Sequence, residues 1–385
     1  MKHLLTSILW MAACLVSLAQ SPKPDPNKVP THLLNRCTQE LRLAQIEKFR
    51  GDPKSEEAVL KALRYLKKMQ NKDGSWSENK QVGMTGLALL CFLGHGETAQ
   101  SDEFGVNVLN AILYLVDTCK KNRGKIASDF SDNHWVYEHA IATNALVEAW
   151  DLGSKGFDEE FPDLEKAAMV GTEILIKNQH ESGGWDYGYA TDSSRGGDTS
   201  IASWHLQAIS AADYGQLPVK NLKKSVTMAI DFFDRCQNSN GSIGYSSTHL
   251  HGDGTTLTSA GALMFQRFKT ANNSHQRRAC RFIAKHIKFD WDTPDCDLYG
   301  HYHASQALRN VSGQTWLNYQ KMVFPQILAN QEDDGSFKIF NGGNKLNAVA
   351  PLFQADPPIS RLYRTCLCTL ILESYYRHPW IPSKI

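Results

Sequence analysis

A recurring turn motif is the feature of this sequence that most limits its fold. Four polar segments centred on glycine end in an aromatic or large apolar residue, and each follows a helix-like stretch. The spacings between their glycines fit one or two units of about fifty residues, which is typical of a fold built from stacked supersecondary units. The four turns are at 70–76, 178–185, 237–243 and 330–337, and a weaker turn at 122–126 fills the first gap.

Two kinds of helix-like stretch alternate around these turns. The first kind is amphipathic, whereas the second has almost no charge and must be buried on all sides or line an enclosed cavity. This alternation predicts an all-α fold, a single (α/α)6 toroid of six outer and inner helix pairs. We expect outer helices over about 55–70, 105–121, 163–178, 220–236, 275–287 and 315–330, and inner helices over about 83–94, 137–151, 198–212, 256–268, 297–310 and 360–376.

The start of the chain differs from the repeats. Residues 1–19 have a short cationic start, an apolar stretch and small residues at the end, a pattern typical of a cleaved secretory signal peptide. We therefore expect a secreted or periplasmic protein, with an extended leader and an N-terminal helix over 20–50 and the toroid over 51–385. Residues 11–14 are close to a lipidation box, but Met11 and the bulky residues after Cys14 argue against a lipoprotein.

The charge balance narrows the classes of partner. Lys and Arg number 41 against 40 Asp and Glu, so the chain lacks the basic field that nucleic-acid binding requires. No segment after the signal has the roughly 18 apolar residues that a transmembrane helix needs. The cysteines after Cys14 are scattered over helix-like segments, and we interpret them as buried small hydrophobic residues without assigning a disulfide. No protein partner is indicated.

The Asp-Gly-Ser-Trp/Phe turns at 70–76 and 330–337, set between alternating outer and inner helices, resemble those of the squalene cyclase and protein prenyltransferase β-subunit superfamily. The resemblance covers about 55–376. It implies a central cavity for apolar prenyl chains, with catalytic groups gathered where the inner helices begin.

The cyclase acid motif is altered at its centre. Residues 195–200 resemble the tail of the motif, but aligned on Asp198 and Thr199 the central acid falls on Gly197. The cyclase reaction protonates an alkene and needs an unusually acidic carboxylic acid. Asp198 is therefore a candidate catalytic residue, and its alternative role is the N-cap of the helix that follows.

The zinc site of the prenyltransferase branch is altered as well. Asp297 stands where the resemblance places a Cys ligand, and Arg364 stands where it places a His. A cationic Arg does not coordinate zinc, so we expect no metal and no other cofactor. Asp297 becomes the second candidate catalytic residue. Arg361 and Arg364 could form an anion site or pair with Asp295 and Asp297.

Further polar groups lie near the expected starts of inner helices. His249 and His251 could chelate a metal with the help of Asp253, or the three could form only a polar turn. His301 and His303 point about 200° apart on a helix, so at most one faces the cavity. The same argument separates the adjacent Glu138 and His139. The cavity-lining candidates are Glu138, His139, His249, His251, Asp253, Tyr299, His303, Arg361 and Arg364.

Two classes of function fit these residues. The first is a binding protein whose central cavity accepts a small hydrophobic or extended ligand. The second is an enzyme, either a divergent terpenoid cyclase or a carbohydrate-active lyase or hydrolase, and the sequence leaves open whether the protein is one. A sugar enzyme would need two carboxylates about 5–10 Å apart across an open groove, whereas a closed, aromatic-lined cavity would favour an isoprenoid. Its acid-base groups would come from Asp198, His251, Asp253, Asp297 and His303.

Overall fold

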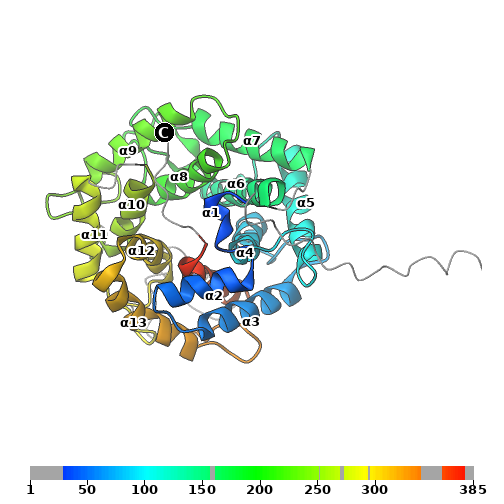
Figure 1. The fold of residues 1–385 in the computed structure, drawn as a ribbon. Helices are drawn as coiled ribbons and strands as arrows, with labels where there is room; N and C mark the ends of the chain where they lie inside the picture. Colours follow the sequence, from blue (N-terminus) through cyan, green and yellow to red (C-terminus); the bar gives the residue numbers. More distant parts are fainter. Residues whose placement is uncertain are drawn as a thin grey trace, which may run out of the picture.

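The computed structural model describes residues 29–156, 161–250, 252–268, 273–293, 295–339 and 358–377. These residues form two concentric rings of helices (Figure 1). The outer ring contains α3 (Lys54–Met69), α5 (Gly105–Lys121), α7 (Pro162–Lys177), α9 (Leu222–Cys236), α11 (Ser274–His286) and α13 (Gly313–Ala329). The inner ring contains α4 (Gln81–His95), α6 (Trp135–Asp151), α8 (Thr199–Tyr214), α10 (Thr255–Phe268), α12 (Leu298–Val311) and α14 (Pro358–Leu372). The described residues contain no strand, and the predicted toroid is confirmed.

Burial separates the two rings as the charge pattern predicts. In α4, every residue after Gln81 is buried, whereas α11 buries only four residues along one face. The last inner helix, α14, packs against both α3 and α4, so the first and last helix pairs are neighbours and the ring is closed.

The repeated turns link neighbouring outer helices through their first glutamine. The Gln70 side chain donates to the Asn107 carbonyl oxygen of α5 over 2.9 Å, and Gln331 donates to the Ala58 carbonyl oxygen of α3 over 2.8 Å. This second bond joins the last turn to the first outer helix. Gly74 has a φ of +89° in its turn, and a Cβ there would lie 2.4 Å from the Asn110 carbonyl oxygen. The motif therefore demands glycine for both its left-handed backbone and its close contact.

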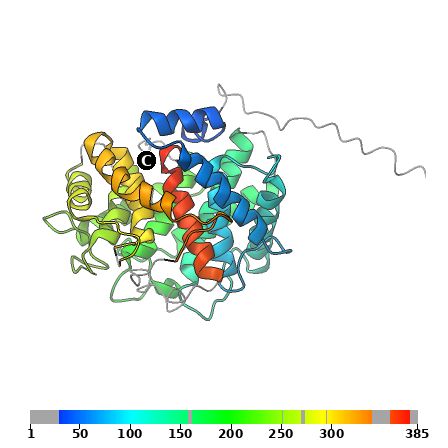
Figure 2. The same ribbon diagram turned by 90° about the horizontal axis from the view of Figure 1, so that it is seen from below.

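The N-terminal segment covers one end of the ring. It forms two helices, α1 (Thr31–Leu34) and α2 (Gln39–Lys48), where the sequence suggested one, because the Thr38 side chain caps a new helix start. Figure 2 shows α2 lying across the toroid. The expected signal, 1–19, lies outside the described residues. None of the described helices has the length and apolar character needed to cross a membrane. All eight cysteines after Cys14 are free, and seven of them are buried.

Candidate functional site

The inner helices all run in the same direction, so their first turns meet at one end of the ring. Hydrogen bonds between first turns show this: the Gly83 N–H of α4 donates to Glu138 of α6, and the Tyr137 hydroxyl of α6 donates to Ser200 of α8. We call this end the N-terminal mouth and define it by Tyr137, Tyr187, Asp198, Tyr245 and Tyr299. It is the end where the sequence places its candidate catalytic groups.

Asp198 is the N-cap of α8 and is fully buried. Its Oδ1 accepts the backbone N–H of Ser200 at 2.6 Å and that of Ile201 at 3.3 Å. Burial raises the pKa of Asp198, and hydrogen bonding from Tyr245 and from the capping amides opposes that rise. The alternative role as a helix cap is therefore real. The same carboxyl is held in a site that favours its protonated form.

Four tyrosines surround Asp198. They come from α6, from the short helix η2 (Tyr187–Tyr189), from the loop after α9 and from α12. Burial is the main cause that raises the pKa of each, and the charge of Asp198 contributes to every one of these rises. Asp198 is therefore near enough to all four phenols to influence their pKa values. The four tyrosines are Tyr137, Tyr187, Tyr245 and Tyr299.

Their hydroxyls form a hydrogen-bonded network. Ser200 Oγ lies 3.3 Å from the Tyr137 hydroxyl and 2.9 Å from the Tyr299 hydroxyl, so it joins α6 to α12 through α8. The Tyr187 and Tyr245 hydroxyls are 2.7 Å apart. Tyr137, Tyr187, Ser200 and Tyr245 all remain half-buried and thus accessible in part. The described mouth residues thus bring hydroxyl groups of α6, α8 and α12 together at one end of the ring.

Arg195 covers the edge of this cluster. Its guanidinium lies 5.1 Å from the Tyr187 ring centre and 5.4 Å from that of Tyr245. It also forms an ion pair with the buried Asp186. Because Arg195 belongs to the segment resembling the cyclase motif, that segment contributes to the mouth even though its central acid is missing.

Gly197 explains why that acid is missing. Its φ is +137°, and a Cβ at this position would lie 2.7 Å from the Gly184 Cα. The backbone of the repeat turn at 178–185 occupies the space that a side chain would need. The cyclase acid therefore has no room in this loop.

Asp297, the second candidate catalytic residue, is buried at the start of α12. Its Oδ1 accepts the Gly300 N–H at 3.1 Å, and its Oδ2 accepts the Thr256 hydroxyl of α10. The carboxylate thus caps one inner helix and links it to the next. Arg364 is buried and donates to the Phe337 carbonyl oxygen at 2.9 Å, while Arg361 is exposed.

The proposed metal-like loop is only partly described. His251 lies outside the described residues, and His249 and Asp253 are exposed. Asp253 Oδ1 accepts the N–H and the hydroxyl of Thr255 at 2.9 and 2.6 Å, which fits the turn alternative. Among the described residues, no three His, Cys, Asp or Glu side chains are grouped to hold a metal ion.

Glu138 and His139 serve different neighbours. Glu138 Oε2 accepts the Gly83 N–H at 3.1 Å and the Ser128 hydroxyl at 2.6 Å, so it caps α4. His139 Nδ1 accepts the Ile126 N–H at 3.0 Å, and burial lowers the pKa of this imidazole to about 3. Both side chains are buried, and His139 is held as a neutral structural group.

Aromatic and amide groups cross the inside of the ring. Trp204 of α8 stacks on Tyr302 of α12 with ring centres 5.5 Å apart, and the Tyr302 hydroxyl donates to Gln207 at 2.7 Å. Because α10 separates these two helices around the ring, such contacts pass through its interior (Figure 1). His303 lies among them, and burial lowers its pKa to about 4.

His301 points outward to Tyr319 of α13, whereas His303 lies inside the ring. This fits the expectation that only one of these two histidines faces the cavity. Of the mouth residues, only Tyr299 was selected from the sequence as a cavity-lining aromatic. Tyr137, Tyr187 and Tyr245 were not, because two of them lie in loops whose folding over Asp198 no local pattern encodes.

Comparisons with known proteins identify the fold. No family model and no curated protein matches the chain. Among solved structures, it is similar to a type II terpene cyclase from Scytonema in complex with geranylgeranyl dihydroxybenzoate, with 12% identity, a TM-score of 0.57, and coverage of 88% of this chain and 99% of the other.

Two carbohydrate-active enzymes match to a similar degree. They are an α-1,6-mannanase from Salegentibacter, with 8% identity, a TM-score of 0.55 and coverage of 83% and 99%, and a cellobiose 2-epimerase from Bacillus thermoamylovorans, with 10% identity, a TM-score of 0.55 and coverage of 85% and 99%. At such identities the likeness concerns the fold alone. The chain has an α/α toroid fold, an architecture that it shares with a terpene cyclase and with carbohydrate-active enzymes.

Proposed function

We propose that the protein binds an extended, hydroxyl-rich ligand of the carbohydrate class at the N-terminal mouth. The observation that carries the proposal is the cluster of four tyrosines and Ser200 around the buried Asp198. Phenol and serine hydroxyls can each donate and accept a hydrogen bond, and the tyrosine rings offer apolar faces for the C–H surface of a sugar. This proposal narrows the expected hydrophobic or extended ligand to an extended polar one.

The interior of the ring supports a polar ligand at the mouth over an apolar chain in the centre. A prenyl chain needs an enclosed apolar space. Here Trp204 and Tyr302 stack across the interior, and Gln207 is hydrogen-bonded to Tyr302. A long apolar ligand would have to separate these side chains and break that hydrogen bond.

A second function, acid catalysis by Asp198, is favoured by the raised pKa of that carboxyl. A carboxylic acid with a raised pKa is better suited than an ordinary one to act as a general acid on a glycosidic oxygen. Asp297 would then be the second carboxylate. Asp198→Asn keeps the shape and hydrogen-bonding capacity of the side chain but removes the acid, so it should abolish any turnover while sugar binding persists.

Binding is tested first with a glycan array. Labelled wild-type protein should bind a subset of oligosaccharides, and Tyr187→Ala or Tyr137→Ala should weaken that binding about tenfold or more, as expected for loss of an aromatic contact at the centre of a site. Tyr114→Ala is the matched control, because Tyr114 is also half-buried but lies on the outer helix α5. Binding should survive in this control.

Two results would count against the proposal. One is no oligosaccharide binding by a correctly folded wild-type protein. The other is equal loss of binding in Tyr187→Ala and in the Tyr114→Ala control. Turnover of an isoprenoid that Asp198→Asn abolishes would instead favour the cyclase alternative.

We also propose that the protein acts outside the cytoplasm as a secreted or periplasmic protein. The support is the signal-like pattern of residues 1–19. The mass of the mature protein checks it, because the proposal requires a new N-terminus near Gln20 without an added lipid. A mature chain that keeps Met1 would contradict it.

A further inference from the structure

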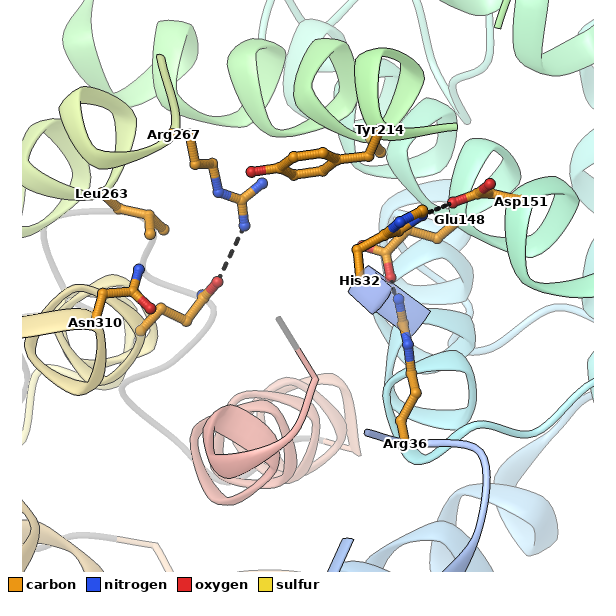
Figure 3. Close-up of a pocket in the computed structure, with 10 residues that line it drawn as sticks. His32, Arg36, Glu148, Asp151, Tyr214, Leu263, Arg267 and Asn310 are labelled. Carbon is orange, nitrogen blue, oxygen red and sulfur yellow. Dashed lines mark hydrogen bonds and ion pairs between the residues drawn. The ribbon is translucent and has the colours of Figure 1, made fainter. Parts of the chain in front are cut away.

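A pocket lies at the opposite end of the ring, where the inner helices end. His32 and Arg36 line it from the N-terminal segment, and the other lining residues come from the last turns of α6, α8, α10 and α12 (Figure 3). Its cavity volume is about 30 Å³, which suits only a small ligand. We call it the arginine pocket, after Arg36 and Arg267. No residue of the proposed sugar site lines it.

Arg267 is a buried cation in this pocket without a carboxylate partner. It ends α10, is only 6% exposed, and donates to the Gln306 side-chain oxygen at 3.2 Å. Among the described residues no acidic group lies within ion-pair distance of it, although burial lowers its pKa and thus disfavours its charge. The carbonyl ends of the inner helices offset part of this cost. The hydrogen bond to Gln306 uses one of the five guanidinium N–H donors of Arg267, so the others are available to a ligand.

The carboxylates near Arg267 are already paired with other side chains. Glu148 lies 3.1 Å from Arg36 and 3.0 Å from Arg377. Asp151 lies 2.5 Å from His32 and 3.1 Å from Lys155. The local environment thus has more cationic than anionic side chains.

One further acid at this end adds no negative charge. Glu373 is fully buried, and burial raises its pKa well above the ordinary value, which disfavours its charged form. Among the described residues Arg267 therefore has no carboxylate within ion-pair distance. Glu148 attracts its charge only from farther away and is shared with Arg36 and Arg377.

We propose that the arginine pocket binds a small oxyanion, a carboxylate or a phosphate, through the guanidinium of Arg267. The planar guanidinium matches two oxygens of such an anion, and the Tyr214 side chain lies beside it in the pocket (Figure 3). His32 stacks on Tyr214 with ring centres 5.7 Å apart, so α1 forms one wall of the site. Binding here is independent of the proposed sugar site.

Thermal unfolding tests the site with sodium phosphate and sodium acetate, each against sodium chloride at equal ionic strength. Wild type should gain a saturable rise in Tm with one of the two anions. Arg267→Gln should weaken the fitted affinity about tenfold or more, because it removes the charged donor. Preference for phosphate or for acetate identifies the source of the oxyanion.

Arg309→Gln is the matched control. Arg309 is also a buried arginine in the last turn of an inner helix, but it lies over the Phe49 ring and outside the pocket. The anion-dependent rise in Tm should persist in this variant. If Arg267→Gln does not fold, Arg267→Lys keeps the charge without the planar fork and should bind measurably more weakly than wild type.

The proposal is overturned by any of three results. Neither anion raises the wild-type Tm above the chloride series, Arg267→Gln responds as strongly as wild type, or Arg267→Lys binds with unchanged affinity.

Discussion

The two ends of the toroid differ because every inner helix points the same way. At the N-terminal mouth, Asp198 and Asp297 cap inner helices, where a carboxylate is stabilised by free N–H groups and by the positive end of the helix dipole. At the opposite end, Arg36 donates to Leu93 O and Arg42 donates to His95 O, both at the end of α4. The direction of the helices therefore favours carboxylate caps at the mouth and arginine donors to helix carbonyl groups at the opposite end.

The two ends also use their polar groups differently. At the end with arginines, Glu148 is fully buried between Arg36 and Arg377, and these contacts hold the N-terminal segment and the chain after α14 to the ring. At the mouth, Tyr137 and Ser200 stay half-buried, and the contacts between them are made by neutral hydroxyls. The comparison indicates that the end with arginines depends more on buried ion pairs, whereas the mouth is linked by neutral hydroxyl groups that stay partly accessible.

The largest predicted effect is at the end with arginines. Glu148→Ala would leave Arg36 and Arg377 buried without their carboxylate, which should lower the free energy of unfolding by about 3–5 kcal/mol. Urea denaturation at neutral pH measures it. A loss below 1 kcal/mol would mean that this end does not depend on its buried ion pairs.

At the mouth, Asp198→Ala should have a smaller effect on stability. It removes the two capping hydrogen bonds at the start of α8, which should cost about 0.5–2 kcal/mol, measured by the same denaturation. If the cost equalled that of Glu148→Ala, the two ends would not differ as argued here.

The ends should also respond to pH in opposite directions. The pKa of Asp198 is raised on folding, so its stabilising contribution is present below its unfolded pKa and is lost as pH rises through the folded value. The pKa of Glu148 is lowered, chiefly by Arg377 and Arg36 against the effect of burial. Its contribution is therefore present above the unfolded pKa and is lost as pH falls.

Difference measurements isolate these two effects. His139 and His303, with pKa values lowered to about 3 and 4, destabilise the whole fold as pH falls below the ordinary histidine range, so each variant is compared with wild type at every pH. As pH rises from about 4 to 8, Asp198→Asn should gain stability relative to wild type. Glu148→Gln should lose stability relative to wild type over the same rise, and most of this loss should fall near pH 4. If the stability differences of both variants from wild type changed with pH in the same direction, the opposite pKa shifts of Asp198 and Glu148 would be contradicted.

The smallest effect is expected on the outer ring. Arg64 and Glu103 form an exposed ion pair at 2.8 Å between α3 and the residues before α5. Arg64→Ala should change the free energy of unfolding by about 1 kcal/mol at most, and less at high salt. If Arg64→Ala lowered the free energy of unfolding as much as Glu148→Ala does, then solvent exposure would not determine how much each ion pair stabilises the fold.

The fold could be predicted from the sequence because its signals are local and repeated. The charged face of α11 predicts a place in the outer ring, and the uncharged residues of α4 predict a place in the inner ring. The turn glycines, such as Gly74, mark several of the places where an outer helix ends and the chain turns toward an inner one. The break between α1 and α2 was not predicted. The sequence pattern places Thr38 within one continuous helix, whereas in the structure its hydroxyl accepts the Leu41 N–H and starts a new helix.

The site was less predictable because it joins distant segments. Asp198 and Tyr299 were selected from their places at helix starts. Tyr187 lies in the short helix η2 and Tyr245 in the loop after α9, and their hydroxyls meet only through the packing of neighbouring repeats. Arg267 carried no motif at all. Arg267 became a candidate because the nearby carboxylates form ion pairs with other side chains, and these pairings follow from tertiary packing.

Native mass spectrometry of the protein isolated from the organism that produces it tests the central claim most directly. We predict a co-purifying polyhydroxylated compound that is lost from Tyr137→Ala and Tyr187→Ala and retained by Arg267→Gln, because only the first two change the mouth. A bound isoprenoid lipid, or a sugar retained by both tyrosine variants, would contradict the assignment of the N-terminal mouth as a carbohydrate site.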